Sequence, residues 1–206
     1  EKDVFPKLIK NNLLSARKYN SFFIDIGIPK TLEKSKNLIP KWRSKGALLL
    51  DRDGVINEDY GYVHKWKDFH FCEGAIEGLK ILLSLNFKII IITNQSGIAR
   101  GIFSERQYLE LTKKYLHELK QKGIQISSVY YCPHHPSFSE KPFDNCECRK
   151  PNPGLYKKAI NRYNFSLDKS IAIGDNERDL IAAKRAGIKS MFLITSNNNI
   201  SFKDQN

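Results

Sequence analysis

Two aspartates follow directly on an apolar run, and this stretch constrains the fold more than any other. Residues 47–50 are Ala-Leu-Leu-Leu, and Asp51, Asp53 and Gly54 come shortly after. A short apolar run that ends in a glycine-containing loop is typical of a buried parallel strand. Both carboxylates would then lie at the carboxyl end of that strand, where open α/β sheets bind ligands. Two acids so close repel each other, so the pair predicts a bound cation, and Mg²⁺ with a phosphate fits this need.

From Gly46 onward, strand patterns alternate with helical patterns. Ser104 is the expected N-cap of one helix, and the Asn-rich end from Ser196 is expected to be frayed. Strand–helix alternation is the pattern of βαβ units, so we predict an α/β fold with a central parallel sheet. The expected strands are 47–50, 87–92, 126–131, 170–173 and 190–194, and the expected helices are 74–85, 104–122, 153–163 and 176–186.

Composition narrows the class of protein. The 206 residues are 41% hydrophobic and 27% charged, which suits one core plus an appendage. The formal charge is +12, but the 34 Lys and Arg residues are scattered, so we expect anionic substrates and no nucleic-acid partner. No apolar run has the length of a membrane span and no export leader opens the chain, so we expect no membrane partner and a cytoplasmic location. The chain begins at Glu1 and its only methionine is Met191, so we expect it to start inside a longer reading frame.

The loops after the predicted strands carry groups that suit phosphate chemistry. Asp175 follows the fourth strand and would join Asp51 and Asp53 in a three-acid cluster suited to Mg²⁺. Such a site would hold a phosphoryl group between a carboxylate nucleophile and a metal, and would act mainly by positioning and charge stabilisation. Hydroxyl, amide and positively charged groups for the phosphate come from the other loops: Thr93, Asn94, Ser96, Arg149 and Lys150.

Three of the four cysteines lie in one stretch, as Cys132-Pro-His134 and Cys146-Glu-Cys148. Three thiolates and an imidazole can close a tetrahedral zinc site, and in a cytoplasmic protein this spacing favours metal over disulfides. Four protein ligands leave no open position, so the Zn²⁺ would be structural and would hold Arg149 and Lys150 near the phosphate. The alternatives are unligated thiols, or His135 in place of His134. Cys72 is interpreted as a buried residue without a ligand role.

Four short motifs together resemble those of the haloacid-dehalogenase-like (HAD) phosphohydrolases: Asp51-Arg52-Asp53-Gly54, Thr93, Lys150 and Gly174-Asp175. Over roughly residues 46–195 the chain resembles, more narrowly, the D-glycero-D-manno-heptose 1,7-bisphosphate 7-phosphatases. The resemblance implies a three-layer Rossmann-like fold with no separate cap domain and a zinc-stapled loop. It also implies Mg²⁺-dependent removal of the 7-phosphate in nucleotide-activated heptose biosynthesis. The narrower resemblance rests on residues 51–57, 61–63, 93–101, 131–136 and 146–151.

The resemblance also implies roles for individual residues. Asp51 would attack phosphorus to form an aspartyl-phosphate, and Asp53 would protonate the leaving sugar oxygen and then activate water. Thr93 and Lys150 would hold the phosphoryl oxygens. Mg²⁺ would be bound by Asp51, Asp175 and the backbone carbonyl of Asp53. The expected substrate contacts are Asp59, Tyr60, Gly61, Tyr62, Asn94, Gln95, Ser96, Arg149 and Asn176.

Other functions remain open at this point. A histidinol-phosphate phosphatase would share the fold, the motifs and the zinc loop. A polynucleotide 3′-phosphatase would need clustered basic residues, which the chain lacks. A different class is a non-catalytic domain that stabilises a fused nucleotidyltransferase, but the retention of all the catalytic acids argues against it.

Residues 1–45 are interpreted as an N-terminal appendage to a phosphatase domain at 46–206, with a strand, a turn and a helix. The segments 1–8 and 23–29 resemble the end of the catalytic domain of sugar-phosphate nucleotidyltransferases, where Asp25 would match a metal-binding aspartate. The glycine-rich nucleotide loop of that family has no counterpart, so the segment would be a remnant of an upstream domain. A fused guanylyltransferase would fit the α-anomer of the heptose as substrate, although the sequence does not settle the anomer.

Overall fold

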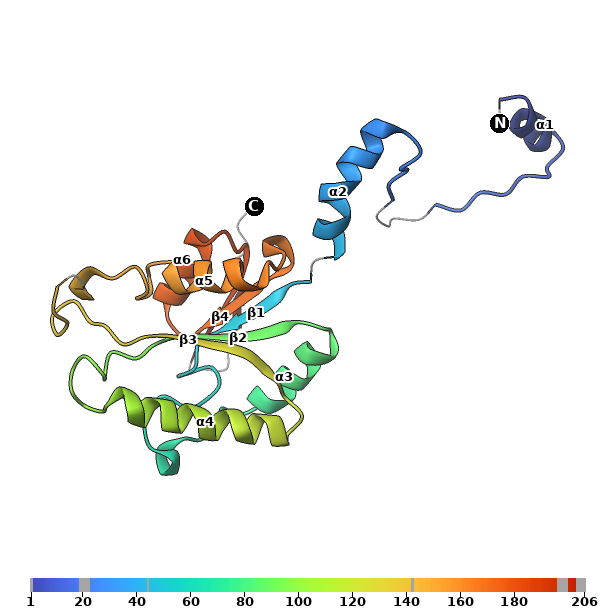
Figure 1. Ribbon diagram of the computed structural model, residues 1–206. Coiled ribbons are helices and arrows are strands. Elements are labelled where there is room, and N and C mark those ends of the chain that lie inside the picture. Colours follow the sequence, from blue (N-terminus) through green and yellow to red (C-terminus); the bar gives the residue numbers. More distant parts are fainter. Residues whose placement is uncertain (1, 19–22, 44, 142, 196–199, 203–206) are drawn as a thin grey trace. The chain divides into compact units, whose positions relative to one another are not determined.

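The structure is a computed structural model that describes residues 2–18, 23–43, 45–141, 143–195 and 200–202 (Figure 1). Its contacts divide the chain into two compact units, Glu1–Arg43 and Ser44–Asn206. The first unit contains helices α1 (Val4–Lys10) and α2 (Pro29–Arg43). The strand predicted in the appendage is absent from the described residues of this unit, so that prediction is wrong there. Asp25 instead accepts a hydrogen bond from the backbone N–H of Gly27 (2.8 Å), which closes a turn in place of strand pairing.

The second unit is built on a six-stranded sheet in the order β3-β2-β1-β4-β5-β6. Strands β1 to β5 are parallel, which confirms the predicted α/β fold, and β6 is antiparallel to β5. The frayed end expected from Ser196 is wrong at 200–202, where β6 pairs with the exposed edge of β5. The strands are β1 (Ala47–Leu50), β2 (Lys88–Asn94), β3 (Ile126–Cys132), β4 (Ile171–Gly174), β5 (Ser190–Ile194) and β6 (Ile200–Phe202).

Helices cover both faces of the sheet and make three layers (Figure 1). Successive residues of β1 serve opposite faces: Leu48 and Leu50 pack toward α3 (Ala75–Ser84) and α4 (Glu105–Gln121), whereas Ala47 and Leu49 pack toward α5 (Gly154–Tyr163) and α6 (Glu177–Arg185). All four are at most 2% exposed. A strand buried on both faces needs an unbroken apolar run, which is why residues 47–50 contain no polar side chain.

The starts of α4 and α6 are fixed by side chains that bind free backbone groups. Ser104 forms a capping box with Gln107 at the start of α4, as the sequence predicts, and Asn176 forms one with Asp179 at the start of α6. The stretch between β1 and α3 holds only the short turn η1 (Trp66–Asp68), and the two other such turns are η2 (Phe143–Asn145) and η3 (Leu167–Lys169). None of the described helices is long and apolar enough to cross a membrane.

Candidate active site

A cleft of about 350 Å³ lies at the carboxyl ends of β1, β2 and β4. It brings together most of the residues singled out in the sequence, and it adds Gly97, Arg100 and Arg178, which the sequence interpretation missed. Lys150, Tyr60 and Asn176 are predicted site residues that do not line it. The predicted residues that line the cleft are Asp51, Asp53, Asp59, Gly61, Tyr62, Thr93, Asn94, Gln95, Ser96, Arg149 and Asp175.

The Asp51 carboxylate is held in place from two sides. Its Oδ1 accepts a hydrogen bond from the backbone N–H of Arg52 (2.7 Å), and its Oδ2 lies 2.8 Å from Lys150 Nζ. Lys150 is 1% exposed, and its ammonium also contacts Asp179 Oδ1 and the carbonyl of Ile92. Burial by itself would lower the pKa of Lys150, but the charges of Asp51 and Asp179 raise it. The ammonium therefore stays charged beside the expected nucleophile.

Asp179 is a site residue that the sequence interpretation missed. It is 1% exposed and lies one turn into α6, four residues after Asp175. A buried ammonium needs compensating negative charge, and Asp179 supplies it to Lys150 together with Asp51. Its i+4 spacing from Asp175 was the available signal, but in the sequence an acid in a first helical turn is equally typical of capping.

Asp53 accepts hydrogen bonds from three side chains. Arg52 donates to its Oδ1 through Nε (3.0 Å) and Nη2 (2.6 Å), and Asn57 Nδ2 donates to the same oxygen (3.0 Å). Gln95 Nε2 donates to Oδ2 (2.9 Å) and also to Thr93 Oγ1 (3.0 Å). Because Gln95 donates to Thr93, the Thr93 hydroxyl is left to donate its own proton elsewhere. Arg52 and Asn57 belong to the stretch 51–57 that carries the family resemblance, but the sequence interpretation gave neither of them a role.

The acids at the strand ends suit a hard divalent cation. Carboxylate oxygens of Asp51, Asp175 and Asp179 lie within 4.8 Å of one another. Burial, together with the charges of Asp51 and Asp179, raises the pKa of Asp175 to about 7, so the group carries negative charge that lacks a full counter-charge. A Cβ atom at Gly54 would lie 2.4 Å from Asp175 Oδ2, so only glycine leaves room for this carboxylate. An oxygen-rich group with excess negative charge fits Mg²⁺. The contribution of the Asp53 carbonyl to metal binding stays a prediction.

The loop after β2 joins the site to the loop after β3. The Asn94 side-chain amide donates to the carbonyl of Lys150 and accepts from its N–H, both at 3.1 Å. At Gly97 a Cβ atom would lie 2.2 Å from the ring of Phe103, so this turn also needs glycine. The side-chain amides of Asn94 and Gln95 are thus bonded to protein groups, and the substrate contacts predicted for them and for Ser96 stay predictions.

Three arginines line the same cleft: Arg100, Arg149 and Arg178. Within the described part of the chain none of them forms an ion pair with a carboxylate. Burial lowers the pKa of Arg149, and the positive charges of Arg178 and Arg100 lower it further. The cleft therefore concentrates positive charge that its own acids do not neutralise.

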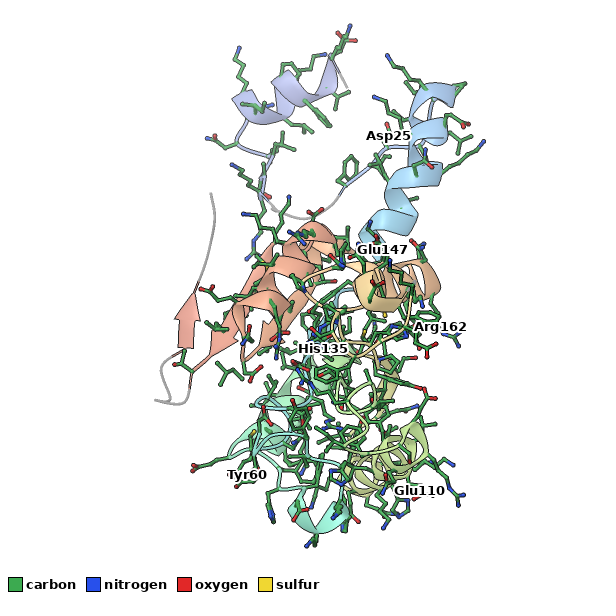
Figure 2. All side chains as sticks on the ribbon, turned by 90° about the vertical axis from the view of Figure 1, so that its left-hand side faces the viewer. Asp25, Tyr60, Glu110, His135, Glu147 and Arg162 are labelled. Atoms are coloured by element: carbon green, nitrogen blue, oxygen red, sulfur yellow. The ribbon has the colours of Figure 1, made fainter. Side chains whose placement is uncertain are left out.

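Two of these arginines are held by the loop after β3. Arg149 Nη1 donates to the carbonyl of His134 (3.1 Å), and Arg100 Nη2 lies 2.8 Å from His135 Nε2. The Arg100 guanidinium also lies over the ring of Phe138, 4.5 Å from its centroid. Figure 2 marks His135 within this loop.

The loop at 57–72 forms another wall of the cleft. Asp59 Oδ1 accepts from the N–H of Gly61 (2.9 Å), and Gly61 and Tyr62 both adopt positive φ, so the backbone turns sharply here. Tyr60, which is labelled in Figure 2, is 67% exposed and hydrogen-bonds to Glu58. It lines a neighbouring hollow instead of the cleft. Asn176 accepts from the N–H of Arg178 as a helix cap. Substrate contacts of Tyr60 and Asn176 stay predictions.

Four side chains at the end of β3 and in the loop after it come together, with ligand atoms within 4.8 Å of one another: Cys132, His134, Cys146 and Cys148. The Cys148 sulfur lies 3.1 Å from that of Cys132 and 3.3 Å from both Cys146 Sγ and His134 Nδ1. All three thiols are free of disulfides. Three sulfurs and one imidazole nitrogen at this spacing suit a tetrahedral Zn²⁺. His134, and not His135, belongs to this group.

Comparison with known proteins gives close relatives. A family model described as HAD-hydrolase-like matches residues 147–200. The D-glycero-alpha-D-manno-heptose-1,7-bisphosphate 7-phosphatase of Photorhabdus laumondii is 44% identical over 158 residues, covering 76% of this chain and 86% of that protein. The D-glycero-beta-D-manno-heptose-1,7-bisphosphate 7-phosphatase of Pasteurella multocida is 43% identical over 150 residues, covering 73% of this chain and 82% of that protein.

A solved structure shows the same likeness in three dimensions. The D,D-heptose 1,7-bisphosphate phosphatase from B. bronchiseptica, complexed with magnesium and phosphate, matches with a TM-score of 0.63 and 34% identity. The match covers 70% of this chain and 78% of that one. The similarity therefore extends over most of the length of each relative and is not restricted to a shared motif.

Proposed function

The chain belongs to the heptose-1,7-bisphosphate 7-phosphatases of the HAD-like hydrolases, and from this membership we propose that it removes the 7-phosphate of D-glycero-D-manno-heptose 1,7-bisphosphate. The observation that carries the proposal is that Asp51 and Asp53 open into one cleft together with three arginines. The two acids supply a nucleophile and a proton donor, and the arginines supply charge for a second anionic group on the same substrate.

The reaction follows from the placement of the two acids. An Asp51 oxygen bonds to phosphorus while the bond from phosphorus to the sugar oxygen breaks, and Asp53 gives that oxygen its proton. Asp53 then takes a proton from water, the water oxygen bonds to phosphorus, and the bond to Asp51 breaks to release phosphate. Thr93 and Lys150 hold the phosphoryl oxygens and the nucleophile in line. Asp51 and Asp175 would hold Mg²⁺, which would supply positive charge to stabilise the transferred phosphoryl group.

The three arginines that line the cleft favour a bisphosphate substrate over a monophosphate substrate. One phosphate belongs beside Asp51 and Thr93, at the strand ends. Arg100, Arg149 and Arg178 then pair with the 1-phosphate, because guanidinium groups bind phosphate oxygens in pairs. Histidinol phosphate has one phosphate and a cationic remainder, so it would leave these arginines without an anion.

We assign a structural Zn²⁺ to the four-residue Cys/His group. It would hold the carbonyl of His134 and the ring of His135 in place, and through them Arg149 and Arg100. The metal would thus affect substrate binding without contacting substrate.

The test of the proposed function compares phosphate release from both anomers of heptose 1,7-bisphosphate with release from histidinol phosphate, using purified protein with Mg²⁺. We expect a clear preference for the bisphosphates. Arg178→Gln should raise KM for the bisphosphate by about 10-fold and change the hydrolysis of histidinol phosphate little. Preference for histidinol phosphate would overturn the proposed substrate, and absence of any turnover would favour a non-catalytic domain.

The role of residues 1–45 is a separate proposal. Their resemblance to the end of a sugar-phosphate nucleotidyltransferase suggests a fused or associated transferase that uses the 1-phosphate product. The two relatives that differ in anomer match equally well, at 44% and 43% identity, so identity does not select the anomer. Faster turnover of the α-anomer would support a guanylyltransferase partner, and faster turnover of the β-anomer would count against it.

A further inference from the structure

Arg52 lies between the two catalytic aspartates in sequence but does not line the cleft. Its side chain is completely buried, with 0% exposure. The guanidinium donates twice to Asp53 Oδ1 and once more, from Nη2, to the carbonyl of Val63 (2.8 Å). A substrate in the cleft therefore meets Asp53 and not the Arg52 side chain, so this side chain can act on the reaction only through the groups that it binds, Asp53 and the carbonyl of Val63.

The two oxygens of Asp53 have unequal surroundings. Oδ1 accepts three N–H groups, two from Arg52 and one from Asn57, at distances from 2.6 to 3.0 Å. Oδ2 accepts one, from Gln95. An oxygen surrounded by three donors, two of them on a cation, has no lone pair to spare for a proton. A proton on Asp53 therefore belongs on Oδ2, and the general acid and base role falls to this oxygen.

Arg52 is itself firmly anchored. Its guanidinium carbon lies 5.7 Å from the centroid of Tyr108, and Tyr108 and Tyr115 of α4 are both 0% exposed. Its carbonyl accepts from the N–H groups of Ile56 (2.8 Å) and Asn57 (3.1 Å). Burial would lower the pKa of Arg52, but the charge of Asp53 and its hydrogen bonds raise it. A charged, immobile guanidinium can fix the rotamer of the carboxylate that it binds.

We propose that Arg52 is the positioning residue that restricts the proton of Asp53 to Oδ2 and keeps that oxygen directed into the cleft. The inference rests on the proposed phosphatase function. In the first step the proton moves from Oδ2 to the leaving oxygen as the bond between that oxygen and phosphorus breaks. In the second step Oδ2 takes a proton from the water that attacks the aspartyl-phosphate. Both transfers need Oδ2 within hydrogen-bond reach of the reacting oxygen.

The test uses Arg52→Lys, which keeps the charge but cannot replace the two N–H groups, from Nε and Nη2, that converge on Asp53 Oδ1. It compares kcat/KM for heptose 1,7-bisphosphate, whose alkoxide needs a proton to leave, with kcat/KM for 4-nitrophenyl phosphate, whose phenolate leaves without one. We expect the first value to fall at least about 100-fold and the second less than about 5-fold. Because Asp53 also activates water, kcat for 4-nitrophenyl phosphate should fall, and a burst of nitrophenolate equal to the enzyme concentration should appear.

Thr93→Ser is the matched control, because it alters a residue expected to hold the phosphoryl oxygens but keeps the hydroxyl to which Gln95 donates. It should lower kcat/KM for both substrates by the same factor. If Arg52→Lys does not fold, as judged by circular dichroism and thermal unfolding, Asn57→Ala removes a different donor to Oδ1 and should give the same split at smaller size.

Equal losses of kcat/KM on both substrates for these variants would show that Arg52 has only a structural role. Unchanged kcat/KM on both substrates would show that Oδ2 transfers its proton equally well without the hydrogen bonds from Arg52. Either result overturns the inference. If the wild-type protein hydrolyses 4-nitrophenyl phosphate but not the bisphosphate, the proposed substrate is wrong, and histidinol phosphate, also an alkyl ester, takes its place in the comparison. If the wild-type protein hydrolyses no phosphate ester, the proposed function fails and the inference fails with it.

Discussion

The described residues of the phosphatase unit include two groups of side chains suited to metals, and the two groups are built in opposite ways. The acids Asp51 and Asp175 follow buried strands, and the buried ammonium of Lys150 pairs with Asp51 and with Asp179. The Cys/His group joins the end of β3 to the long loop that follows, and among the described residues of that loop η2 is the single regular element before α5. The first group is fixed by the sheet, whereas the second ties together a loop with little secondary structure.

This difference indicates which metal supports folding and which supports chemistry. In the acid cleft the buried ammonium of Lys150 already balances part of the negative charge, so the arrangement does not depend on Mg²⁺. In the Cys/His loop the ligand groups themselves make the main contacts that close the loop. The ordered conformation of the loop would therefore depend on the bound metal. Changes in the cleft should therefore affect rate with little effect on folding, and changes in the loop should affect both.

The largest expected effect comes from Asp51→Asn. An amide cannot attack phosphorus, so kcat/KM for the bisphosphate should fall by at least about 10⁴-fold. The midpoint of thermal unfolding should shift little, because Asp179 still neutralises Lys150. Phosphate release and thermal unfolding measure the two effects. Glu110→Gln, which alters an exposed carboxylate on α4 (Figure 2), is the control and should behave as the wild type. Activity above a tenth of the wild-type value would exclude Asp51 as the nucleophile.

A loss in both rate and stability is expected for Cys148→Ser. It removes one of four metal ligands, so bound zinc measured by elemental analysis should fall from about one per chain, and kcat/KM should drop by about 10–100-fold through Arg149 and Lys150. The unfolding midpoint should drop as well. Cys72→Ser provides the control, since Cys72 lies outside the Cys/His group and should leave the zinc content unchanged. A variant at Cys148 that retains its zinc would remove the contrast between the two groups.

A smaller change is expected for Asp179→Asn. Lys150 would keep its contact with Asp51 but lose its contact with a second carboxylate. The ammonium would then attract the Asp51 carboxylate more strongly and make it a weaker nucleophile. We expect kcat/KM to fall about 10-fold and the free energy of unfolding to fall by less than about 1 kcal/mol, because Asp51 still neutralises Lys150. Steady-state kinetics and urea unfolding measure these values. Glu177→Gln, an exposed change in the same helical turn, is the control. An unchanged kcat/KM would mean that Asp179 does not affect the nucleophile through Lys150.

The smallest effect concerns protons and Mg²⁺. Burial and the neighbouring acids raise the pKa of Asp175 from 3.8 to about 7. A raised carboxyl pKa favours the folded state at low pH, and this contribution is lost as pH rises from about 4 to about 7 in the metal-free protein. Mg²⁺ should displace the proton, so calorimetry in buffers of different ionisation heat should show proton release at pH 6 that vanishes above about pH 8. Magnesium binding without proton release at pH 6 would contradict this.

The strand-end residues were predictable because local pattern determines them. An apolar run followed by a polar loop identifies Asp51, Thr93 and Asp175, and parallel strands bring their carboxyl ends to one edge. The Cys/His group was predictable for the same reason, since its spacing within one loop carries the signal.

What the sequence could not reveal depends on packing between distant elements. Asp179 and Arg52 are charged residues at positions that pattern alone places in solvent, and they are buried only because each meets a counter-charge. Arg100 and Arg178 line the cleft because of the way the loop after β2 and the first turn of α6 are oriented, and a sequence pattern does not predict such orientations. The strand expected in the appendage failed because alternating apolar residues form a strand only beside another strand, and the described residues of that unit offer none.

The amide of Asn94 has a consequence for how the loop after β3 can change. It binds both backbone groups of Lys150, as a neighbouring strand would, while the Cys/His group closes the loop upstream at Cys132 and Cys146. The position of the lysine is therefore independent of the length of chain between the two cysteines. Residues could be inserted or deleted near 136–141 to reshape the entrance of the cleft, and substrate range could diversify there while the reaction centre stays unchanged.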